Sequence, residues 1–349
     1  MVDLARHLDP REDAAGGGGA EGRVLSVCAV VVTYDEDPAV VRAAIDSLRA
    51  QTRQPDEILL VDNKPGAALP PLEDAPEVRV IAPDRNLGYP NAINFAVEHT
   101  DATYVLTLNP DAQAEPECLE RLLAADAAIA GAQIVSQDGE TTQAGDNPLH
   151  PTGISPARGY GRPREHGPAR DALVVSGACT LFDRETFVGL GGFMRSFFLY
   201  YDDADIGWRA RLAGERVVYC PEAVVRHGYE FGRRERKMFL LERNRLIALL
   251  SNYEARTLAV LTPLLLATEV GVTLLAALQG WLPEKLQAYA SVWSLRREVR
   301  RHRRHVQSLR QVRDHDLRPL FATRLESPFI PRPASRLLGA VTSAYLRLV

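Results

Sequence analysis

Continuous apolar runs alternate with helix-like segments through the first third of the chain. The run SVCAVVVTY at 26–34 is rich in valine and lacks polar alternation, which is typical of a strand buried on both faces. Residues 38–50 open with proline and repeat apolar residues at helical spacing, and 57–63 form a second apolar run. Strands at 78–83 and 103–112, with a helix at 90–99 between them, continue the pattern. This alternation predicts an α/β fold with a doubly wound, mostly parallel sheet flanked by helices.

Polar residues gather where the predicted strands end. In open α/β sheets, ligands bind at the carboxyl ends of the strands, so these side chains would line one polar crevice. Each of them alone would also fit an ordinary turn, because Asn, Asp and Gly are turn formers. No G-x-G-x-x-G follows the first strand, which argues against a nicotinamide oxidoreductase. The residues concerned are Thr33, Tyr34, Asp35, Asp62, Asn63, Asn86, Gly88, Asn109 and Asp111.

The composition indicates a folded cytoplasmic protein and disfavours several other classes. The chain has 349 residues, of which 46% are hydrophobic and 25% charged, and its net charge is −4. It can therefore bury a large core, and no overall positive charge favours a nucleic-acid partner. The four cysteines are far apart and form no C-x-x-C pair, so a zinc module and a disulfide framework are both disfavoured and a reducing cytoplasm fits. Residues 1–23 hold several acids and a glycine run but no apolar core, which predicts a disordered tail.

A dense group of acids lies between aromatic and basic residues at 197–214, FFLYYDDADIGWRARLAG. Asp202, Asp203 and Asp205 directly follow two phenylalanines, a leucine and two tyrosines that favour burial. A carboxylate at the edge of an apolar pocket has its pKa moved toward working pH, which makes it a candidate general base. The alternative is an acidic first turn of a helix that begins near Ile206, favoured by the helix dipole.

Six sequence blocks follow one another between about residues 25 and 250: VVVTYDED, ILLVDN, RNLGYPNAINFA, LTLNPDA, VSGACTLFDRETFVGLGGF and FFLYYDDADIGWR. In this order they resemble the blocks of the inverting family 2 glycosyltransferases with the GT-A fold. Within that family, the most similar subset is the rhamnosyltransferase-like branch that builds bacterial cell-wall and surface polysaccharides.

The resemblance implies a catalytic domain at 24–254, with a nucleotide-sugar half at about 24–135 and an acceptor half at about 173–254. It implies that Asp62 contacts the nucleobase, with Thr33 and Tyr34 in the same pocket. The donor would also be bordered by Asn63, Asn86, Gly88 and Asn109.

The same resemblance implies a divalent cation, Mg²⁺ or Mn²⁺, on the donor diphosphate. The family's D-x-D motif corresponds to Asn109-Pro110-Asp111, so Asp111 would carry most of the metal contact and Asn109 departs from the pattern. His227 lies 24 residues after Asp203, a separation similar to that of a metal-binding histidine in related galactofuranosyltransferases. His227 is therefore a second candidate ligand, with a purely structural histidine as the alternative.

The acid cluster gains a role from the family pattern. The catalytic base of the family corresponds to Asp203, and Asp202 stands where a glutamate is usual. On the acceptor side we expect Gly192, Asp202, Trp208 and Arg209, although a helix face packed on the sheet fits Trp208 and Arg209 equally well. Residues 138–172 are rich in Gly, Pro and charge, which predicts a mobile loop over the site rather than core.

Residues 255–349 form a helical C-terminal region by their pattern. The stretch 258–278 has one charge, Glu269, and is long enough to cross a bilayer, yet that charge, Pro263 and Gly271 weaken a span. A membrane-surface segment and a buried core or dimer helix remain alternatives. Residues 296–313 hold eight arginines against one glutamate, which favours anionic lipid over nucleic acid because no aromatic platform accompanies them. A solvated helix face or a homo-oligomer contact would also explain them.

Together these features predict a metal-assisted inverting glycosyltransferase. We expect a dTDP- or UDP-sugar donor, with rhamnose as the leading sugar, and a saccharide or lipid-linked acceptor. The enzyme would work in the cytoplasm at the inner face of the membrane, with peripheral contact through 258–313. The main alternative is a catalytically degenerate nucleotide-binding or scaffold protein on the same fold, which Asn109 favours. The sequence leaves the nucleotide, sugar, acceptor, linkage and oligomeric state open, because sugar choice depends on the placement of a few side chains.

Overall fold

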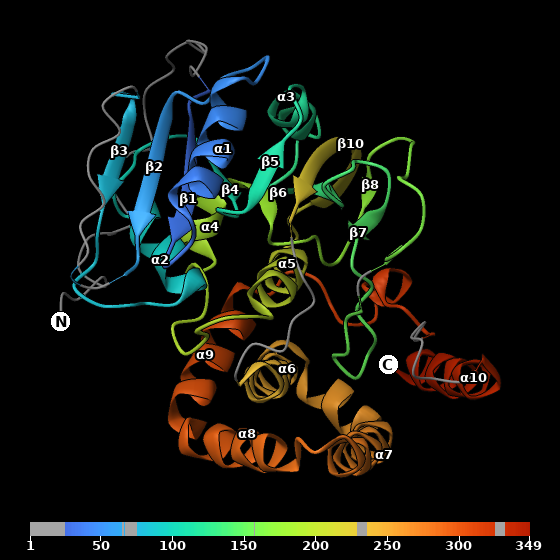
Figure 1. The fold of residues 1–349 in the computed structure, drawn as a ribbon. Helices are drawn as coiled ribbons and strands as arrows, with labels where there is room; N and C mark the ends of the chain where they lie inside the picture. The colour runs from blue at the N-terminus through green and yellow to red at the C-terminus, as the bar shows by residue number, and fades with distance from the viewer. Residues whose placement is uncertain (1–24, 65, 67–74, 157, 229–235, 325–331) are drawn as a thin grey trace, which may run out of the picture.

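The computed structural model describes residues 25–64, 66, 75–156, 158–228, 236–324 and 332–349. The expected tail at 1–23 lies outside them. A mixed sheet with helices on both faces forms one part of the molecule, and a layered group of helices lies along one side of it (Figure 1). The predicted α/β fold with a helical C-terminal region is confirmed.

The first four strands form a parallel sheet in the order β3-β2-β1-β4. Their bounds follow the apolar runs of the sequence, and the connecting helices follow the helical repeats. These elements are β1 (Val27–Thr33), α1 (Pro38–Arg49), β2 (Glu57–Asp62), β3 (Val78–Ile81), α2 (Tyr89–Val97) and β4 (Tyr104–Leu108).

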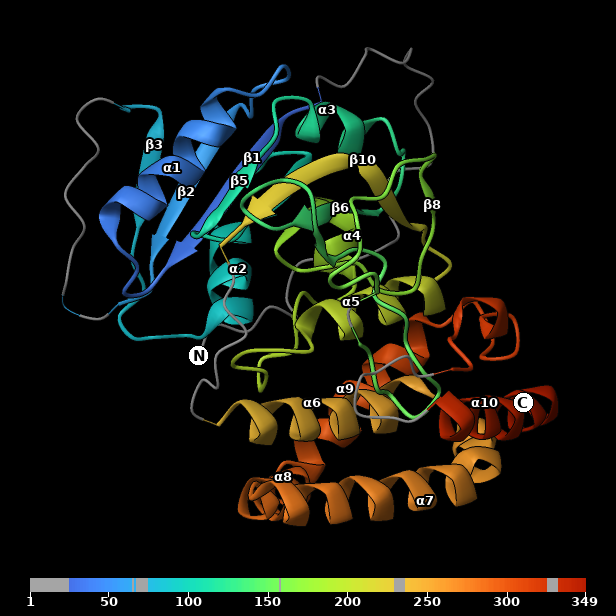
Figure 2. The same cartoon turned by 45° about the vertical axis from the view of Figure 1, so that its right-hand side comes forward.

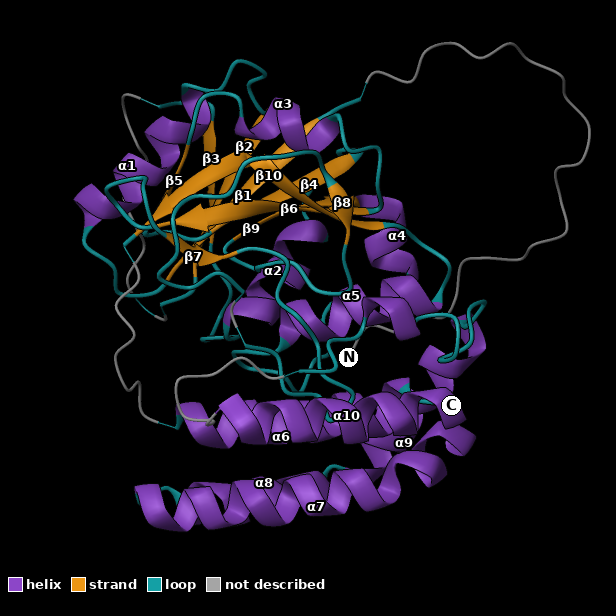
Figure 3. Ribbon diagram, turned by 90° about the vertical axis from the view of Figure 1, so that its right-hand side faces the viewer, coloured by secondary structure: helices purple, strands orange, loops and turns teal. Residues whose placement is uncertain are grey.

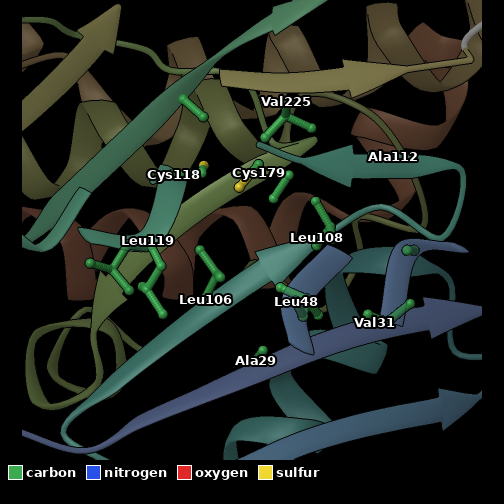
Figure 4. Close-up of a cluster of buried hydrophobic side chains, with 14 of the residues drawn as sticks. Ala29, Val31, Leu48, Leu106, Leu108, Ala112, Cys118, Leu119, Cys179 and Val225 are labelled. Carbon is green, nitrogen blue, oxygen red and sulfur yellow. The ribbon is translucent and has the colours of Figure 1, made fainter. Parts of the chain in front are cut away.

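Strand β1 has no polar alternation because both of its faces are covered. Val27, Ala29 and Val31 pack in the cluster that contains helix α1, drawn in Figure 4, whereas Cys28 and Val30 pack in the cluster that contains α2. All seven residues of the strand are buried. Burial on both faces is the arrangement expected for central strands of a parallel sheet. All four cysteines are buried and free of disulfides.

The second half of the sheet is mixed, so the expectation of a mostly parallel sheet holds only up to β4. Strand β9 lies antiparallel between β4 and β6, while β10 is parallel to β6 and antiparallel to β5. The elements of this half are β5 (Ala112–Ala114), α3 (Cys118–Leu123), β6 (Ile129–Val135), β7 (Thr142–Ala144), β8 (Arg170–Asp171), β9 (Cys179–Asp183), α4 (Arg184–Gly189), α5 (Asp202–Leu212) and β10 (Val217–His227).

The helical part begins with α6, which lies between α5 and the layer formed by α7 and α8 (Figures 2 and 3). Gly280, with a φ of 80°, ends α7 in a left-handed cap and allows the sharp turn into α8. The elements are α6 (Lys237–Asn252), α7 (Ala255–Gln279), α8 (Leu282–Ser294), α9 (Arg296–Leu309), the 3₁₀ helix η1 (Arg318–Leu320) and α10 (Arg332–Leu348).

A buried ion network joins α6, α7 and α8. Arg245 lies 2.5 Å from a carboxylate oxygen of Glu269, and Lys285 lies 2.7 Å from the other oxygen. Glu242 also pairs with Arg245, at 2.7 Å, and with Lys285, so two cations face two anions. Burial raises the pKa of Glu269, but Arg245 and Lys285 outweigh this effect and hold the pKa below its ordinary value.

Glu269→Ala should destabilise the protein by about 3 kcal/mol, because Arg245 and Lys285 would then share the single carboxylate of Glu242. Leu278→Ala is the matched control on the same helix, since Leu278 is 86% exposed, and it should change the free energy of unfolding by less than about 0.5 kcal/mol. Urea unfolding measures both values. Equal stability of the two variants would show that the network does not support the helical layer.

Candidate functional site

A cavity of about 510 Å³ lies between the strand ends, the start of α5 and the side chain of Leu241 on α6. Ten of the residues singled out from the sequence line it together. They come from six separate stretches of the chain, so the fold brings the polar strand ends and the acid cluster to one place. These residues are Thr33, Tyr34, Asn63, Asn86, Gly88, Asn109, Asp111, Asp202, Asp203 and His227.

The end of β1 is held in a tight turn by Glu36. Its Oε2 accepts hydrogen bonds from Thr33 Oγ1 at 2.8 Å and from the backbone N–H of Tyr34 at 2.7 Å. Glu36 also lines the cavity, and the sequence reasoning did not select it. This turn leaves the Tyr34 side chain half exposed at the cavity edge, where its ring is available for stacking.

Asn63 and Asn86 fix the next part of the rim by bonding to each other. Asn63 Nδ2 donates to Asn86 Oδ1 at 3.1 Å, and Asn63 Oδ1 accepts from the backbone N–H of Leu87 at 2.9 Å. Asp62, expected at the nucleobase, is buried and is not among the residues that line the cavity. Its Oδ1 accepts from the backbone N–H of Lys64 at 3.2 Å.

Asp111 and His227 meet although 116 residues separate them. The antiparallel pairing of β5 with β10 places His227 opposite Ala112, directly beside Asp111. His227 Nε2 then lies 3.0 Å from Asp111 Oδ1 and 3.3 Å from Asn109 Nδ2. An imidazole nitrogen and a carboxylate oxygen, both of which can bind a metal ion, thereby lie next to each other.

This pair fits a divalent cation that is shared with a substrate. Within the described residues no group of three or more His, Cys, Asp or Glu side chains could hold a metal alone. Mg²⁺ and similar ions commonly take only one or two protein ligands and complete their shell with phosphate oxygens and water. No lysine or arginine is among the described residues that line the cavity, so a bound diphosphate would need such a cation for charge neutralisation.

Asp202 and Asp203 begin helix α5, where the helix dipole favours acids. Burial, together with the nearby charge of Asp203, raises the pKa of Asp202 to about 8. Burial also raises the pKa of Asp203, but the N–H groups of Ala204, at 2.8 Å, and Gly177, at 3.3 Å, favour its ionised form. The two backbone donors therefore favour Asp203 as the ionised member of the pair, and burial favours Asp202 as the protonated member.

The third acid of the cluster has a structural position. Asp205 is buried and pairs with Arg209 at 2.8 Å. Arg209 also donates to the backbone oxygens of Leu190 and Gly192, each at 2.8 Å, so it holds the segment before α5. Neither Arg209 nor Gly192 lines the cavity, although both were expected on the acceptor side.

Trp208, also expected on the acceptor side, is fully buried away from the cavity. Its ring packs edge-on against Tyr253, with centroids 4.6 Å apart, and against Phe321, with centroids 5.6 Å apart. Trp208 and Arg209 therefore match the alternative of a packed helix face, because both are buried and only the first three residues of α5 line the cavity.

Two consecutive tyrosines with left-handed backbone precede the acids. Tyr200 has a φ of 67° and Tyr201 a φ of 70°, a backbone conformation that residues other than glycine rarely adopt. Asn244 on α6 holds this turn, because its Nδ2 donates to the backbone oxygens of Leu199, at 3.1 Å, and Tyr200, at 2.8 Å. Asn244 is fully buried, and the sequence gave no motif that pointed to it.

The start of α2 holds the same segment from the opposite side. The backbone N–H of Tyr89 donates to the oxygen of Phe198 at 3.1 Å. Asn91 Nδ2 donates to the oxygens of Arg195, at 3.1 Å, and Phe197, at 3.0 Å. The start of α2 thus packs against the segment that leads to Asp203.

Residues 138–172, expected as a loop over the site, do border the cavity but are partly core. Leu149 is buried in the same cluster as Trp208. Gln143, Asn147 and Ser155 line the cavity. Within the described part of the chain, Gln143 Oε1 and Asn147 Oδ1 are buried without a hydrogen-bond partner, so they are free to accept hydrogen bonds from a ligand.

Comparison with known proteins gives a consistent result. The family model of glycosyl transferase family 2 matches residues 28–190. The chain is 31% identical over 229 residues to an N-acetylglucosaminyl-diphospho-decaprenol L-rhamnosyltransferase of Mycobacterium tuberculosis, covering 57% of this chain and 74% of that protein. It is 29% identical over 223 residues to the O-antigen biosynthesis protein RfbC of Myxococcus xanthus, covering 59% of this chain but 17% of that protein.

Among solved structures, GalNAc-T7 with UDP, GalNAc and Mn²⁺ has a similar fold, with a TM-score of 0.56 and 13% identity. The likeness covers 70% of this chain and 51% of that one, so this chain spans about half the length of that structure. It supports the predicted fold.

Gly88→Ala should destabilise the site more than a glycine replacement elsewhere, because an added Cβ would lie 2.1 Å from the backbone oxygen of Phe198. Gly161 has almost the same φ, 74° against 73°, but open space around it, so Gly161→Ala reports the backbone strain alone. We expect Gly88→Ala to cost about 1–3 kcal/mol more than Gly161→Ala in thermal or urea unfolding. Equal costs would mean that the contact between Gly88 and Phe198 does not constrain the segment before α5.

Proposed function

The chain belongs to glycosyl transferase family 2 and is a glycosyltransferase, and from this premise we propose that it transfers a sugar with inversion of configuration. The proposed donor is a dTDP- or UDP-sugar, with rhamnose as the sugar. The proposed acceptor is a saccharide or a polyprenyl-linked saccharide of cell-wall or surface polysaccharide synthesis. The names of the relatives from Mycobacterium tuberculosis and Myxococcus xanthus support this choice.

One observation carries the proposal: the partly buried carboxylate of Asp203 lines the same cavity as a pair of side chains that offers one oxygen and one nitrogen ligand. Asp203 comes from the start of α5, whereas Asp111 and His227 come from the paired ends of β5 and β10. A single-displacement transfer needs a base on one side of the sugar and charge stabilisation at the leaving group on the other. Separate elements supply these two functions here.

Asp203 acts as the general base in this proposal. It removes the proton of an acceptor hydroxyl while the hydroxyl oxygen forms a bond to the anomeric carbon. The bond from that carbon to the diphosphate breaks at the same time, and the nucleoside diphosphate leaves with the bonding electrons. Attack opposite the leaving group inverts the configuration. Asp203 suits this task because burial raises its pKa toward working pH while two backbone N–H groups keep it ionised.

Asp111 and His227 would hold a divalent cation, and Asn109 would contribute at most a neutral oxygen. Bound there, Mg²⁺ or Mn²⁺ would offset the negative charge that develops on the leaving diphosphate. Thr33, Tyr34, Asn63, Asn86 and Gly88 form the rim on which we place the nucleoside and donor sugar.

Gln143 and Asn147 replace Trp208 and Arg209 as our proposed contacts to saccharide hydroxyls. Their buried, unpartnered oxygens line the cavity, whereas Trp208 and Arg209 do not. Sugar hydroxyls are the donors that such oxygens accept. We place the enzyme in the cytoplasm at the inner face of the membrane, where a polyprenyl-linked acceptor would be available.

A catalytically degenerate nucleotide-binding protein is the second candidate. Asn109 favours it, because a neutral amide stands where the general family pattern has a carboxylate and its Nδ2 lies 3.3 Å from His227. Both candidates predict nucleotide binding, so only turnover separates them.

Asp203→Asn should lower kcat by about 10²–10⁴-fold while donor affinity changes little, since the base acts on the acceptor. Asp202→Asn should keep kcat within about tenfold, because asparagine resembles the neutral carboxyl group that a pKa of about 8 implies. Steady-state kinetics and calorimetric donor binding measure both effects. An equal loss of kcat in Asp203→Asn and Asp202→Asn would contradict the proposal that Asp203 alone is the general base.

The raised pKa of Asp202 also predicts the direction in which the stability of the protein depends on pH. The folded protein holds a proton on Asp202 at a pH where the unfolded chain has lost it, so the contribution of Asp202 to stability falls as pH rises from about 4 to about 8. Asp202→Asn removes this dependence, so the variant should gain stability relative to wild type across that range. A constant difference in unfolding free energy with pH would contradict the buried, protonated Asp202.

Asp111→Ala should weaken metal-dependent binding of the nucleoside diphosphate at least about tenfold, because one charged ligand is lost. Asn109→Asp should strengthen metal binding by adding a carboxylate beside Asp111. Asp35→Ala is the control, since Asp35 is an exposed acid that follows the neighbouring strand β1 and does not line the cavity. Calorimetry with Mn²⁺, Mg²⁺ and chelator distinguishes these outcomes, and an unchanged metal titration in Asp111→Ala would overturn the proposed metal site.

A further inference from the structure

Helix α7 presents a long apolar face to solvent. Only 11% of its most apolar stretch is buried, so it is not a core helix. Among the described residues it is the one helix whose length and composition would allow it to cross a bilayer. Its exposed residues after Arg256 include no charged side chain. They are Ala259, Thr262, Pro263, Leu266, Ala267, Val270, Gly271, Leu274, Leu275, Ala277, Leu278 and Gln279.

The ion network holds α7 in place against α6 and α8. Glu269, in the middle of α7, bonds to Arg245, Lys285 and Tyr289 at 2.5–2.8 Å. Moving α7 away to span a bilayer would carry Glu269 into hydrocarbon and leave two cations with the one carboxylate of Glu242. Both steps cost several kcal/mol, so the structure favours a helix that lies along the protein surface.

A basic margin adjoins this apolar face. Helix α9 follows directly after α8, and it has six arginines against one glutamate. Five of these arginines are exposed: Arg296, Arg297, Arg300, Arg301 and Arg304. Trp293, which is 72% exposed at the end of α8, stacks with Arg296, whose guanidinium lies 5.2 Å from the ring centroid.

We propose that the exposed face of α7 and α8, with the start of α9, docks flat on a bilayer that contains anionic lipid. Apolar side chains would enter the acyl boundary, Trp293 would lie at the headgroup level, and the arginines would contact anionic headgroups. We choose a lipid surface rather than another protein as the binding partner, because the apolar face adjoins the exposed arginines of α9 and anionic headgroups would pair with them. A second copy of this chain would bring the same arginines into mutual repulsion.

Docking of this face would bring the cavity close to the membrane surface. Its role in catalysis, described next, rests on the proposed function. Leu241 of α6 lines the cavity, and its neighbour Leu240 packs in a cluster with Ala288 of α8. One helix layer, about 8–10 Å between axes, therefore separates the cavity from the docking layer. Figure 3 shows α7 and α8 as the outermost layer on this side of the molecule. An acceptor saccharide on a polyprenyl lipid would reach the cavity from the docked surface.

Sedimentation with vesicles of equimolar phosphatidylglycerol and phosphatidylcholine tests the proposal on the full chain. The apolar variant is Leu274→Ser with Leu278→Ser, and the charge variant is Arg296→Gln with Arg297→Gln and Arg300→Gln. The matched controls are Val40→Ser on α1 and Arg121→Gln on α3, exposed residues on two helices that lie away from α7 and α8 (Figure 1). Circular dichroism confirms that each variant is folded, which is expected because every changed side chain is exposed.

We expect wild type and both controls to bind the mixed vesicles. The charge variant should bind roughly fivefold more weakly for each arginine removed, and high salt should release the wild type. The apolar variant should bind roughly tenfold more weakly or worse. Pure phosphatidylcholine vesicles should bind poorly.

Three results would overturn the proposal. Binding that resists high salt and needs detergent for release would assign α7 as a span. Absence of vesicle binding together with a dimer that Leu274→Ser disrupts, measured by analytical ultracentrifugation, would assign the face to a second copy. Vesicle binding that neither variant reduces would place the contact elsewhere.

The docking proposal and the proposed function fail separately. With a water-soluble short-chain acceptor analogue, the apolar and charge variants should transfer sugar as well as wild type does. Wild type that binds vesicles but transfers no sugar to any acceptor would leave the docking face intact and overturn the transferase mechanism. Variants that lose transfer even to the soluble acceptor would show that these residues act on the site itself, contradicting a docking role.

Discussion

The left-handed backbone of Tyr200 and Tyr201 is the constraint on which the site depends. Each such residue costs about 1–3 kcal/mol unless its surroundings hold it there. Asn244 does so through two buried hydrogen bonds to the turn, and Tyr201 adds a third through its hydroxyl group to Gly153 at 2.5 Å. The turn reverses the chain so that α5 begins at the cavity. Asp202 and Asp203 then enter the cavity while Asp205, one turn further, enters the core.

Helix α6 connects this turn to the outer helices. Its residues Glu242, Arg243, Asn244 and Arg245 are consecutive and all buried. Because successive helix residues point about 100° apart, four in a row cover the whole circumference. Arg243 and Asn244 hold the segment at 196–200, whereas Glu242 and Arg245 belong to the ion network with α7 and α8. The turn that precedes α5 and the helices with the exposed apolar face are therefore held by one largely buried helix, α6.

Much of the first half of the fold follows from the sequence because local pattern and tertiary environment agree there. Strand β1 shows no polar alternation, and only burial on both faces accommodates such a strand. The polar ends of these strands predict the cavity rim for the same reason, since parallel strands end at one edge. Asp62 is the exception among these strand ends, because its side chain is buried and does not line the cavity. Side chains alternate between the two faces of a strand, and the apolar run of β2 does not show on which face its last residue lies.

The second half depends on contacts that no local pattern records. Trp208 and Arg209 lie on α5 beside the acids, yet burial against Tyr253 and the pairing with Asp205 turn them into core residues. A mixed sheet arises because β9 enters between β4 and β6 in the opposite direction, and its short apolar run does not reveal that direction. Asn244, a single amide in an ordinary helix, has no sequence signature at all.

The charges that line the cavity explain why a neutral residue at position 109 is compatible with catalysis. Four carboxyl groups line the cavity, those of Glu36, Asp111, Asp202 and Asp203, and among the described lining residues no lysine or arginine balances them. A diphosphate adds further negative charge, so its binding is favourable only if the site does not itself repel it. Raising the pKa of Asp202 to about 8 removes one charge, and asparagine at 109 avoids another. In the proposed site His227 would supply a ligand atom without negative charge, so the cation would keep more of its charge for the diphosphate than in a site of two carboxylates.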